Sequence, residues 1–177
     1  ARAKDMAERM RGDKGIRIMF YNLENLFFPT NDSLTMDDEY TPEGMRGWTY
    51  KKLARKSNNL YKAIIGVGGW EAPEIIGMCE IENRAALNTL LKESPLGTVG
   101  YKILHRDSPD PRGIDVAMLY RRDKVQVLSS RAIPVRFPFD TASRTRDILL
   151  AKMLVLDRDT LYLFVNHWPS RFGGYAN

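Results

Sequence analysis

The stretch LYLFVNHWPSR, residues 161–171, decides the fold of this chain. Its apolar run Leu161–Val165 is typical of a buried strand, and Asn166 and His167 follow directly. Pro169 then prevents further sheet pairing, because proline has no backbone N–H to donate. A histidine at the end of a strand has a rigid support, which is typical of side chains that meet a substrate, and we expect it to face solvent.

Two earlier segments pass from an apolar run to a polar loop in the same way. They are IRIMFYNLEN, residues 16–25, and PEIIGMCEIEN, residues 73–83. Asn22 and Glu80 stand at these two strand ends. Magnesium is commonly held by one or two carboxylates and completes its shell with water and phosphate. We therefore expect Asn22, Glu80 and His167 to form one metal-assisted site.

The remaining pattern predicts two helices, one capped by Thr49 and ended by the glycines from Gly66, and one that runs from an Asn83 cap to Ser94. The order of strands and helices indicates a mixed sheet with helices on one face. Residues 28–48 form a long polar loop, in which an acidic triplet, residues 37–39, is expected to be solvated. The predicted strands are Ile16–Asn22, Glu74–Glu80, Tyr101–His105, Asp115–Tyr120, Val125–Ile133, Asp147–Leu156 and Leu161–Asn166.

Four motifs together resemble those of a known family. YNLENLF, MCEIEN, RGIDVAMLYRR and FVNHWPSR follow the order and approximate spacing of the endonuclease/exonuclease/phosphatase family, the deoxyribonuclease I-like phosphoesterases. One such motif alone occurs by chance, whereas four in order are a strong signal. Family members continue with a G-D-x-N segment and a closing S-D-H segment, and neither occurs in these 177 residues. The chain thus resembles the amino-terminal half of the family fold.

This resemblance implies an α/β (α+β) fold: a mixed, mostly antiparallel sheet with flanking helices, part of a four-layer α/β/β/α sandwich without its carboxy-terminal half. Residues 15–177 would form this domain portion, and the charged residues 1–14 an arm outside it. The uncovered sheet face should be apolar. The missing half, a second copy, or the chain's own strands folding over could cover it.

The resemblance also assigns roles at the predicted site. Glu80 corresponds to the metal-binding glutamate, for Mg²⁺ or Mn²⁺, and Asn22 to an asparagine that arranges the metal or the phosphate. His167 corresponds to the residue that donates to the scissile phosphate. Glu24 is a weaker metal candidate. Without the resemblance, a surface glutamate would be the better interpretation of Glu80, and turn geometry alone could explain Asn22.

Three further residues are assigned to substrate binding. Arg146 resembles an arginine that contacts phosphate in many relatives, and a planar guanidinium suits that contact. Arg144 lies close enough to compete for this assignment, and a solvated arginine is an equally good interpretation. Arg112 lies in a loop where relatives contact substrate, and Asn166 stands beside the predicted catalytic histidine.

Composition limits the function classes only broadly. The net charge is +5, which favours anionic partners without naming one. No apolar run approaches the ~20 residues that span a bilayer. The first residues lack the apolar core of a secretory signal. Because the chain begins with Ala, a leader could have been removed, so a soluble protein of the cytoplasm and an exported one are both open. Cys79 is the single cysteine and is expected to be a buried apolar residue.

We predict a metal-dependent phosphoesterase, an endonuclease acting on the phosphodiester bonds of nucleic acid. Glu82 is a counter-signal, since a carboxylate near the metal residue would repel nucleic-acid phosphates. The first alternative is a phosphatase or phosphodiesterase acting on lipid, sugar or inositol phosphates. The second is a non-catalytic half-domain that serves as a binding module. The 177 residues alone are expected to be inactive or nearly so.

Overall fold

The computed structural model describes residues 15–140 and 142–168, so the predicted arm, residues 1–14, lies outside the described part. No helix in the described ranges is long and apolar enough to cross a membrane. In chain order the elements are β1 (Ile18–Leu26), η1 (Asp38–Tyr40), α2 (Tyr50–Val67), β2 (Ile75–Ile81), α3 (Arg84–Lys92), η2 (Pro95–Val99), β3 (Tyr101–His105), β4 (Asp115–Arg121), β5 (Val125–Ile133), β6 (Ile148–Val155) and β7 (Asp159–Val165).

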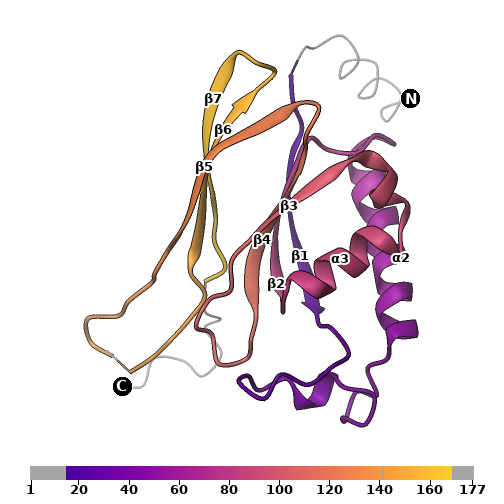
Figure 1. Cartoon of the computed structure of the whole chain (residues 1–177), viewed down its shortest axis with the longest axis vertical. Helices are drawn as coiled ribbons and strands as arrows, with labels where there is room; N and C mark the ends of the chain where they lie inside the picture. The colour runs from indigo at the N-terminus through magenta and orange to yellow at the C-terminus, as the bar shows by residue number, and fades with distance from the viewer. Residues whose placement is uncertain (1–14, 141, 169–177) are drawn as a thin grey trace.

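The strands form two sheets that face each other, with α2 and α3 on the far side of the first sheet (Figure 1). The first sheet has the order β1-β2-β4-β3, in which only the β1–β2 pair is parallel. The second is the antiparallel sheet β5-β6-β7. The predicted mixed, mostly antiparallel α/β architecture is confirmed. Its strands are divided between two sheets, which form two separate layers.

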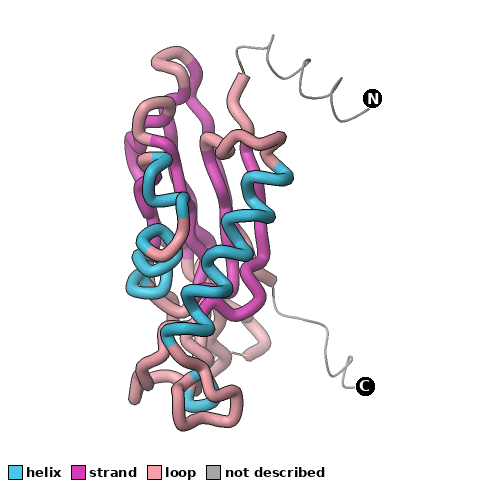
Figure 2. The backbone as a smooth tube through the Cα atoms, turned by 90° about the vertical axis from the view of Figure 1, so that its right-hand side faces the viewer, coloured by secondary structure: helices cyan, strands magenta, loops and turns pink. Residues whose placement is uncertain are grey.

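Both helices begin where the sequence predicts. Thr49 caps α2 by accepting a hydrogen bond from the backbone N–H of Lys52 at 3.3 Å. Asn83 caps α3 in the same way, accepting from the backbone N–H of Ala86 at 2.9 Å. Such caps satisfy N–H groups that have no partner inside the helix. Figure 2 shows the two helices lying together over one face of the first sheet.

An apolar core lies between the two sheets, so the chain's own strands fold over the first sheet, which is one of the three covers that the sequence left open. Met118 from β4 and Met153 from β6 are fully buried there. Burial of each contributes roughly 1.5–3 kcal/mol. Strand β6 alternates strictly between buried and half-buried residues, because one of its faces meets the first sheet. The chain's own second sheet therefore covers β2 and β4 of the first sheet, whereas Ile18 and Phe20 of the edge strand β1 remain 50% and 57% exposed.

Apolar side chains remain exposed on the outer face of the second sheet instead. Tyr162 and Phe164 of β7 expose 59% and 55% of their surface. Their register partners on β6 are Lys152 and Leu150. The Lys152 ammonium lies 5.5 Å from the centre of the Tyr162 ring. We call this surface, made of Tyr162, Phe164, Lys152 and Leu150, the outer sheet face.

Candidate active site

Paired irregularities in the parallel strands β1 and β2 build the centre of the site. Regular pairing stops after Asn22 on β1 and resumes at Leu26, so β1 continues beyond the predicted strand end. Glu24 and Asn25 have φ values of 52° and 65°, and Glu80 on β2 has 60°. Non-glycine residues rarely adopt this left-handed region, at a cost of about 1–3 kcal/mol each. Bulges of this kind redirect side chains, and they are frequent beside functional sites.

The Glu80 carboxylate is where the three predicted residues meet. Its Oε1 accepts a hydrogen bond from Asn22 Nδ2 at 3.0 Å and lies 3.4 Å from His167 Nε2. Its Oε2 accepts from the backbone N–H of Asn25 at 3.1 Å. The amide oxygen of Asn22 accepts from the backbone N–H of Glu24 at 2.8 Å. Asn22 therefore holds Glu80 in place with its nitrogen, and its oxygen faces its own loop.

The imidazole of His167 is largely buried, which corrects the expectation that it faces solvent. Its side chain is 18% exposed, directly after β7. Burial lowers the pKa of His167, and the nearby positive charge of Arg146 lowers it further. Among the described residues its Nδ1 is buried without a hydrogen-bond partner. The ring is therefore neutral near pH 7, with Nε2 directed toward Glu80.

Arg146 lies beside this histidine, and Arg144 does not share its environment. The Arg146 guanidinium is buried and donates from Nη1 to Asp110 Oδ2 at 2.7 Å. Its Nη2 donates to the carbonyl oxygen of Trp168 at 3.2 Å. Arg144 is exposed and donates to carbonyl oxygens of its own loop, residues 142 and 143. Of the two competing arginines, Arg146 is the one next to His167.

Asp110 is a member of this arrangement that the sequence analysis missed. The residue is 5% exposed and lies between two arginines. Its Oδ1 accepts from the backbone N–H of Arg112 at 2.9 Å and lies 3.6 Å from Arg112 Nε. Arg112 itself is exposed, and Asn166 is half-buried beside His167. The signal for Asp110 was present in the segment Asp-Pro-Arg-Gly, since aspartate often accepts from the backbone two residues later in turns.

The loop that carries Asp110 is anchored by the buried carboxylate of Asp115. Asp115 Oδ2 lies 3.0 Å from His105 Nε2, and Oδ1 accepts from both the backbone N–H and the hydroxyl of Ser108. Burial raises the pKa of Asp115, and these contacts oppose that rise. Asp107, His105 and Asp115 bring potential metal-ligand atoms within 4.8 Å of one another. Asp107 is 89% exposed, and the contacts of Asp115 are those of a loop anchor.

Glu82 and its neighbour Asp37 are buried, which overturns two sequence expectations. Glu82 is 5% exposed and accepts a hydrogen bond from the backbone N–H of Phe28. Burial and the adjacent Asp37 carboxyl raise the pKa of Glu82 to about 8. Glu82 is thus a neutral interior carboxyl that does not repel a substrate. Asp37 is 1% exposed, so the acidic triplet is not a wholly solvated loop.

Lys56, on α2, reaches the bulge of β1 beside the site. Its Nζ donates to the carbonyl oxygens of Glu24 and, at 3.4 Å, of Asn25. Burial lowers the pKa of Lys56, against the raising influence of Glu24 and Glu80. Lys56 therefore stabilises the bulge of β1 from the side of α2.

Comparison with known proteins places this geometry in a family. Residues 17–177 match the model of the Endonuclease/Exonuclease/phosphatase family. No curated protein sequence matches the chain. Among solved structures, the human Nocturnin catalytic domain with bound sulfate is 16% identical, with a TM-score of 0.55 over 89% of this chain and 52% of that one.

Two further solved structures are similar at the level of the fold. ANGEL2, a 2',3'-cyclic phosphatase, in complex with adenosine-2',3'-vanadate, is 12% identical, with a TM-score of 0.57 over 84% of this chain and 40% of that one. An endonuclease/exonuclease/phosphatase family protein from Bacteroides thetaiotaomicron is 17% identical, with a TM-score of 0.50 over 84% of this chain and 47% of that one. The chain spans about half the length of these relatives or less. The match from residue 17 to residue 177, together with the shared fold, shows that the chain belongs to the Endonuclease/Exonuclease/phosphatase family.

Proposed function

We propose that the chain contributes the metal and phosphate contacts of a divalent-metal-dependent phosphoesterase, an endonuclease that hydrolyses phosphodiester bonds. The observation that carries this proposal is the meeting of Asn22 and His167 at the Glu80 carboxylate, within 3.0 and 3.4 Å. Backbone strain at Glu80 supports it, because strained residues cluster at functional sites. Membership of the family supports the broader class of phosphoesterase.

The residues present fit a magnesium or manganese ion. An ionised carboxylate can accept about four hydrogen bonds or ligand contacts, and Glu80 uses part of this capacity for Asn22 and Asn25. Glu80 is the ligand in our proposal, and Asn22 orients it. One or two protein carboxylates suffice for magnesium, which keeps several waters. When bound, such a cation neutralises charge on the phosphoryl oxygens.

His167 and Arg146 provide the donors for the phosphate. The neutral ring of His167 donates its Nε2 hydrogen to a phosphoryl oxygen, and its burial keeps the ring in one orientation. Asp110 holds the Arg146 guanidinium beside it at 2.7 Å. Donors that are fixed before the reaction stabilise developing negative charge without reorganising, which is why they accelerate phosphoryl and acyl transfer.

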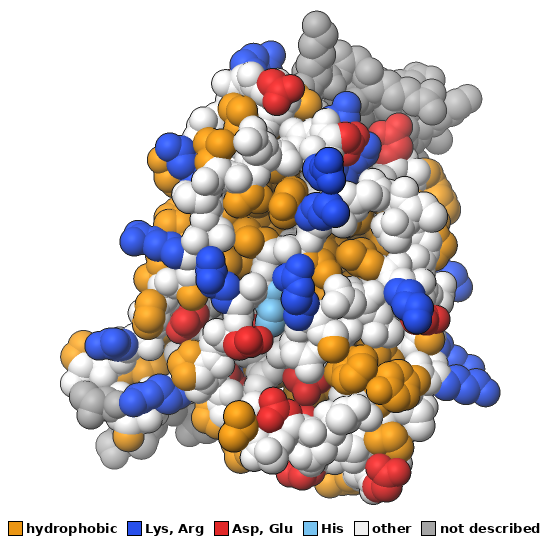
Figure 3. Space-filling view, viewed as in Figure 1, with side chains coloured by type: hydrophobic (Ala, Val, Ile, Leu, Met, Phe, Trp, Pro, Cys, Tyr) orange, Lys and Arg blue, Asp and Glu red, His pale blue; other side chains and the backbone are white. Residues whose placement is uncertain are grey.

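The burial of Glu82 removes the sequence argument against nucleic acid. Basic side chains also spread across the face seen in Figure 3, several of them around its middle, while acidic side chains lie mainly in its lower half. The first alternative, a phosphatase for sugar, lipid or inositol phosphates, uses the same Glu80–His167 centre and differs in what surrounds it. The non-catalytic alternative, a half-domain that only binds, gives no reason for the backbone strain at Glu80.

Glu80→Gln tests the proposal in the full-length protein. Hydrolysis of plasmid DNA, RNA and bis-p-nitrophenyl phosphate would be measured with Mg²⁺, with Mn²⁺ and with a chelator. The variant keeps the shape of the side chain and removes the charge, so we expect activity to fall by several orders of magnitude. Glu43→Gln, at an exposed loop position, is the matched control. Activity that survives in Glu80→Gln, or that needs no divalent ion, would contradict the proposal.

A further inference from the structure

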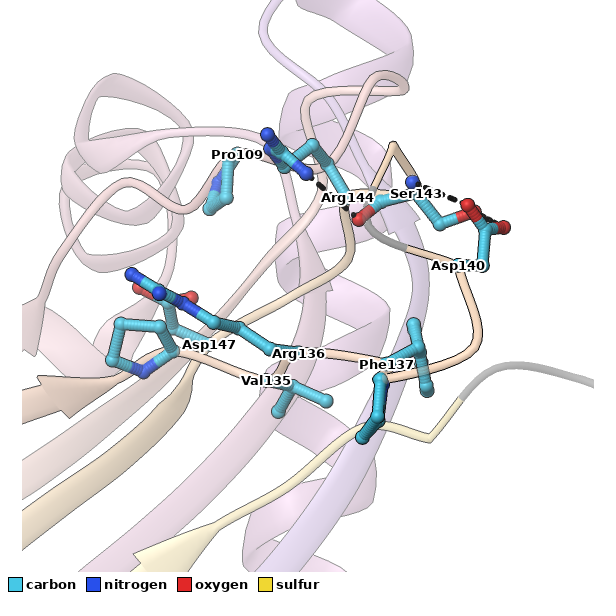
Figure 4. A pocket seen from close by; sticks show the side chains of 10 residues that line it. Pro109, Val135, Arg136, Phe137, Asp140, Ser143, Arg144 and Asp147 are labelled. Atoms are coloured by element: carbon cyan, nitrogen blue, oxygen red, sulfur yellow. Dashed lines mark hydrogen bonds between the residues drawn. The ribbon is translucent and has the colours of Figure 1, made fainter.

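A pocket of about 590 Å³ lies beside the candidate active site, between the β3–β4 loop and the segment that joins β5 to β6. Its walls are mainly apolar and come from Pro109, Pro134, Val135 and Phe137. Polar and charged side chains complete the lining: Arg136, Asp140, Ser143, Arg144 and Asp147. Figure 4 shows the Arg136 side chain extending toward Asp147 and Pro109, while Phe137 stands at the other end.

The pocket and the active site share a wall. Pro109 and Asp147 line the pocket, and the residues next to them in the chain, Asp110 and Arg146, form the buried ion pair at 2.7 Å. Arg146 also donates to the carbonyl oxygen of Trp168, the residue after His167. A substrate whose phosphate meets His167 and Arg146 would therefore have its next chemical group within reach of the pocket.

The side chains of the pocket define what that group must offer. Proline rings and the half-buried ring of Phe137 present flat apolar surfaces. Asp147 Oδ1 is buried and has no hydrogen-bond partner among the described residues. Burial raises the pKa of Asp147, as expected for a carboxyl that has lost water without gaining a donor. Asp147 also lines the pocket, so its carboxylate offers a hydrogen-bond acceptor to a ligand there.

We propose that this pocket receives a nucleobase, so that the substrate of the proposed phosphoesterase is a nucleotide or a nucleic acid. Phe137 stacks on the base, since every base has a π face that an aromatic ring can cover. Asp147 accepts a hydrogen bond from an exocyclic amino group, as acidic side chains do from cytosine. A lipid chain would make no hydrogen bond with Asp147, and a sugar would not use the flat apolar surfaces of Phe137 and the prolines. The inference rests on the proposed function only for the position of the phosphate.

Binding and hydrolysis are measured separately to test the pocket. Affinities of the full-length protein for CMP, AMP and ribose 5-phosphate are determined by isothermal titration, and hydrolysis of bis-p-nitrophenyl phosphate is followed in parallel. We expect both nucleotides to bind more tightly than the sugar phosphate. Phe137→Ala should weaken nucleotide binding by roughly five- to 150-fold, the range seen when a stacking aromatic is truncated.

Two control variants separate the pocket from general effects. Phe164→Ala truncates an exposed phenylalanine on β7, and it should leave nucleotide binding unchanged. Asp147→Asn should weaken CMP binding, whereas Asp157→Asn, in the exposed β6–β7 turn, should not. The affinity for ribose 5-phosphate should change little in either variant, because Asp147 recognises the base.

The outcomes distinguish this inference from the proposed function. Equal affinity for CMP and ribose 5-phosphate, or nucleotide binding unaffected by Phe137→Ala, overturns the nucleobase pocket even where hydrolysis is intact. Selective nucleotide binding that Phe137→Ala and Asp147→Asn both weaken supports the pocket. If that selectivity persists while no phosphoester is hydrolysed, the pocket stands and the proposed function falls.

Discussion

His167 combines two properties that a phosphate donor needs. It is held by its surroundings, being 18% exposed, and its Nε2 lies 3.4 Å from the Glu80 carboxylate. A lowered pKa keeps the ring neutral near pH 7. Because Nδ1 is buried, Nε2 is the ring nitrogen that meets the phosphate in our proposal. A freely solvated histidine would lose entropy on meeting the phosphate, whereas this one is already oriented.

His167→Ala should reduce kcat of the full-length protein by roughly 10²–10³-fold. This is the effect of losing one oxyanion donor, which raises the activation free energy by about 2.7–4 kcal/mol. His167→Gln should recover part of this loss, because the amide can donate from a similar position. Steady-state kinetics gives the effect, and thermal unfolding of each variant shows whether the fold is retained. A fall in stability with unchanged kcat would mean that the residue is structural.

Glu82 makes stability depend on pH. Its pKa is about 8 in the folded chain, against an ordinary value of 4.5, so the folded state binds this proton more tightly. The stabilisation is complete below pH 4.5 and is lost as pH rises through about 8. The slope from this group is at most about 1.4 kcal/mol per pH unit. We expect urea denaturation between pH 6 and pH 9 to show this decline.

Glu82→Gln should flatten that profile, because a neutral amide replaces the titrating carboxyl and keeps an acceptor for the Phe28 N–H. Its stability should approach or exceed that of the parent chain at pH 9. A profile identical to that of the parent would show that Glu82 is ionised in the fold, and the argument that it cannot repel phosphate would fail.

Among the secondary-structure elements, the bulges of β1 and β2 matter most for the site. Parallel pairing alone would have kept Glu80 in the regular alternation of a strand that is otherwise buried. The positive φ values at Glu24, Asn25 and Glu80 break this alternation. Lys56, from α2, stabilises the break by donating to two carbonyl oxygens of β1. Helix α2, on one face of the first sheet, thus supports the bulge at the end of β1.

Asn25→Val should destabilise the chain by at least about 1–2 kcal/mol, because a β-branched residue disfavours the left-handed region. Asn25→Gly is the matched control and should be near neutral, since glycine adopts φ of 65° without strain. Both variants retain the backbone N–H that donates to Glu80. Urea midpoints compare their stabilities, and equal midpoints would show that the bulge does not have this conformation.

At the scale of the whole molecule, the two sheets bury an apolar core between them and leave the outer sheet face exposed. Exposed apolar residues that gather on a flat sheet are a route to association. We expect the 177-residue chain to self-associate through Tyr162 and Phe164. Phe164→Lys should shift the chain toward monomer, measured by light scattering during size-exclusion chromatography. Lys124→Glu, an exposed charge change between β4 and β5, should have no such effect. A monomeric parent chain at high concentration would refute this expectation.

The local features of the fold could be predicted from the sequence. The caps at Thr49 and Asn83 and the helices after them depend on contacts within a few residues, so a short sequence pattern contains them. Strands β3 and β5 appear with the predicted bounds for a similar reason, because alternation and turn residues are local. The four motifs likewise identified the family, and with it Asn22, Glu80 and His167 as candidates that do meet.

What required tertiary structure depended on contacts between distant residues. Only the packing of the second sheet on the first showed which apolar side chains stay exposed, on β1 as well as on β7. Burial of Glu82 and Asp37, the ion pair of Asp110 with Arg146, and the contact of Lys56 with β1 each join segments far apart in the chain. The sequence by itself thus determined the elements, the family and the central residues of the site. The environment of each charge was decided by tertiary structure, because desolvation and pairing depend on which segments fold together.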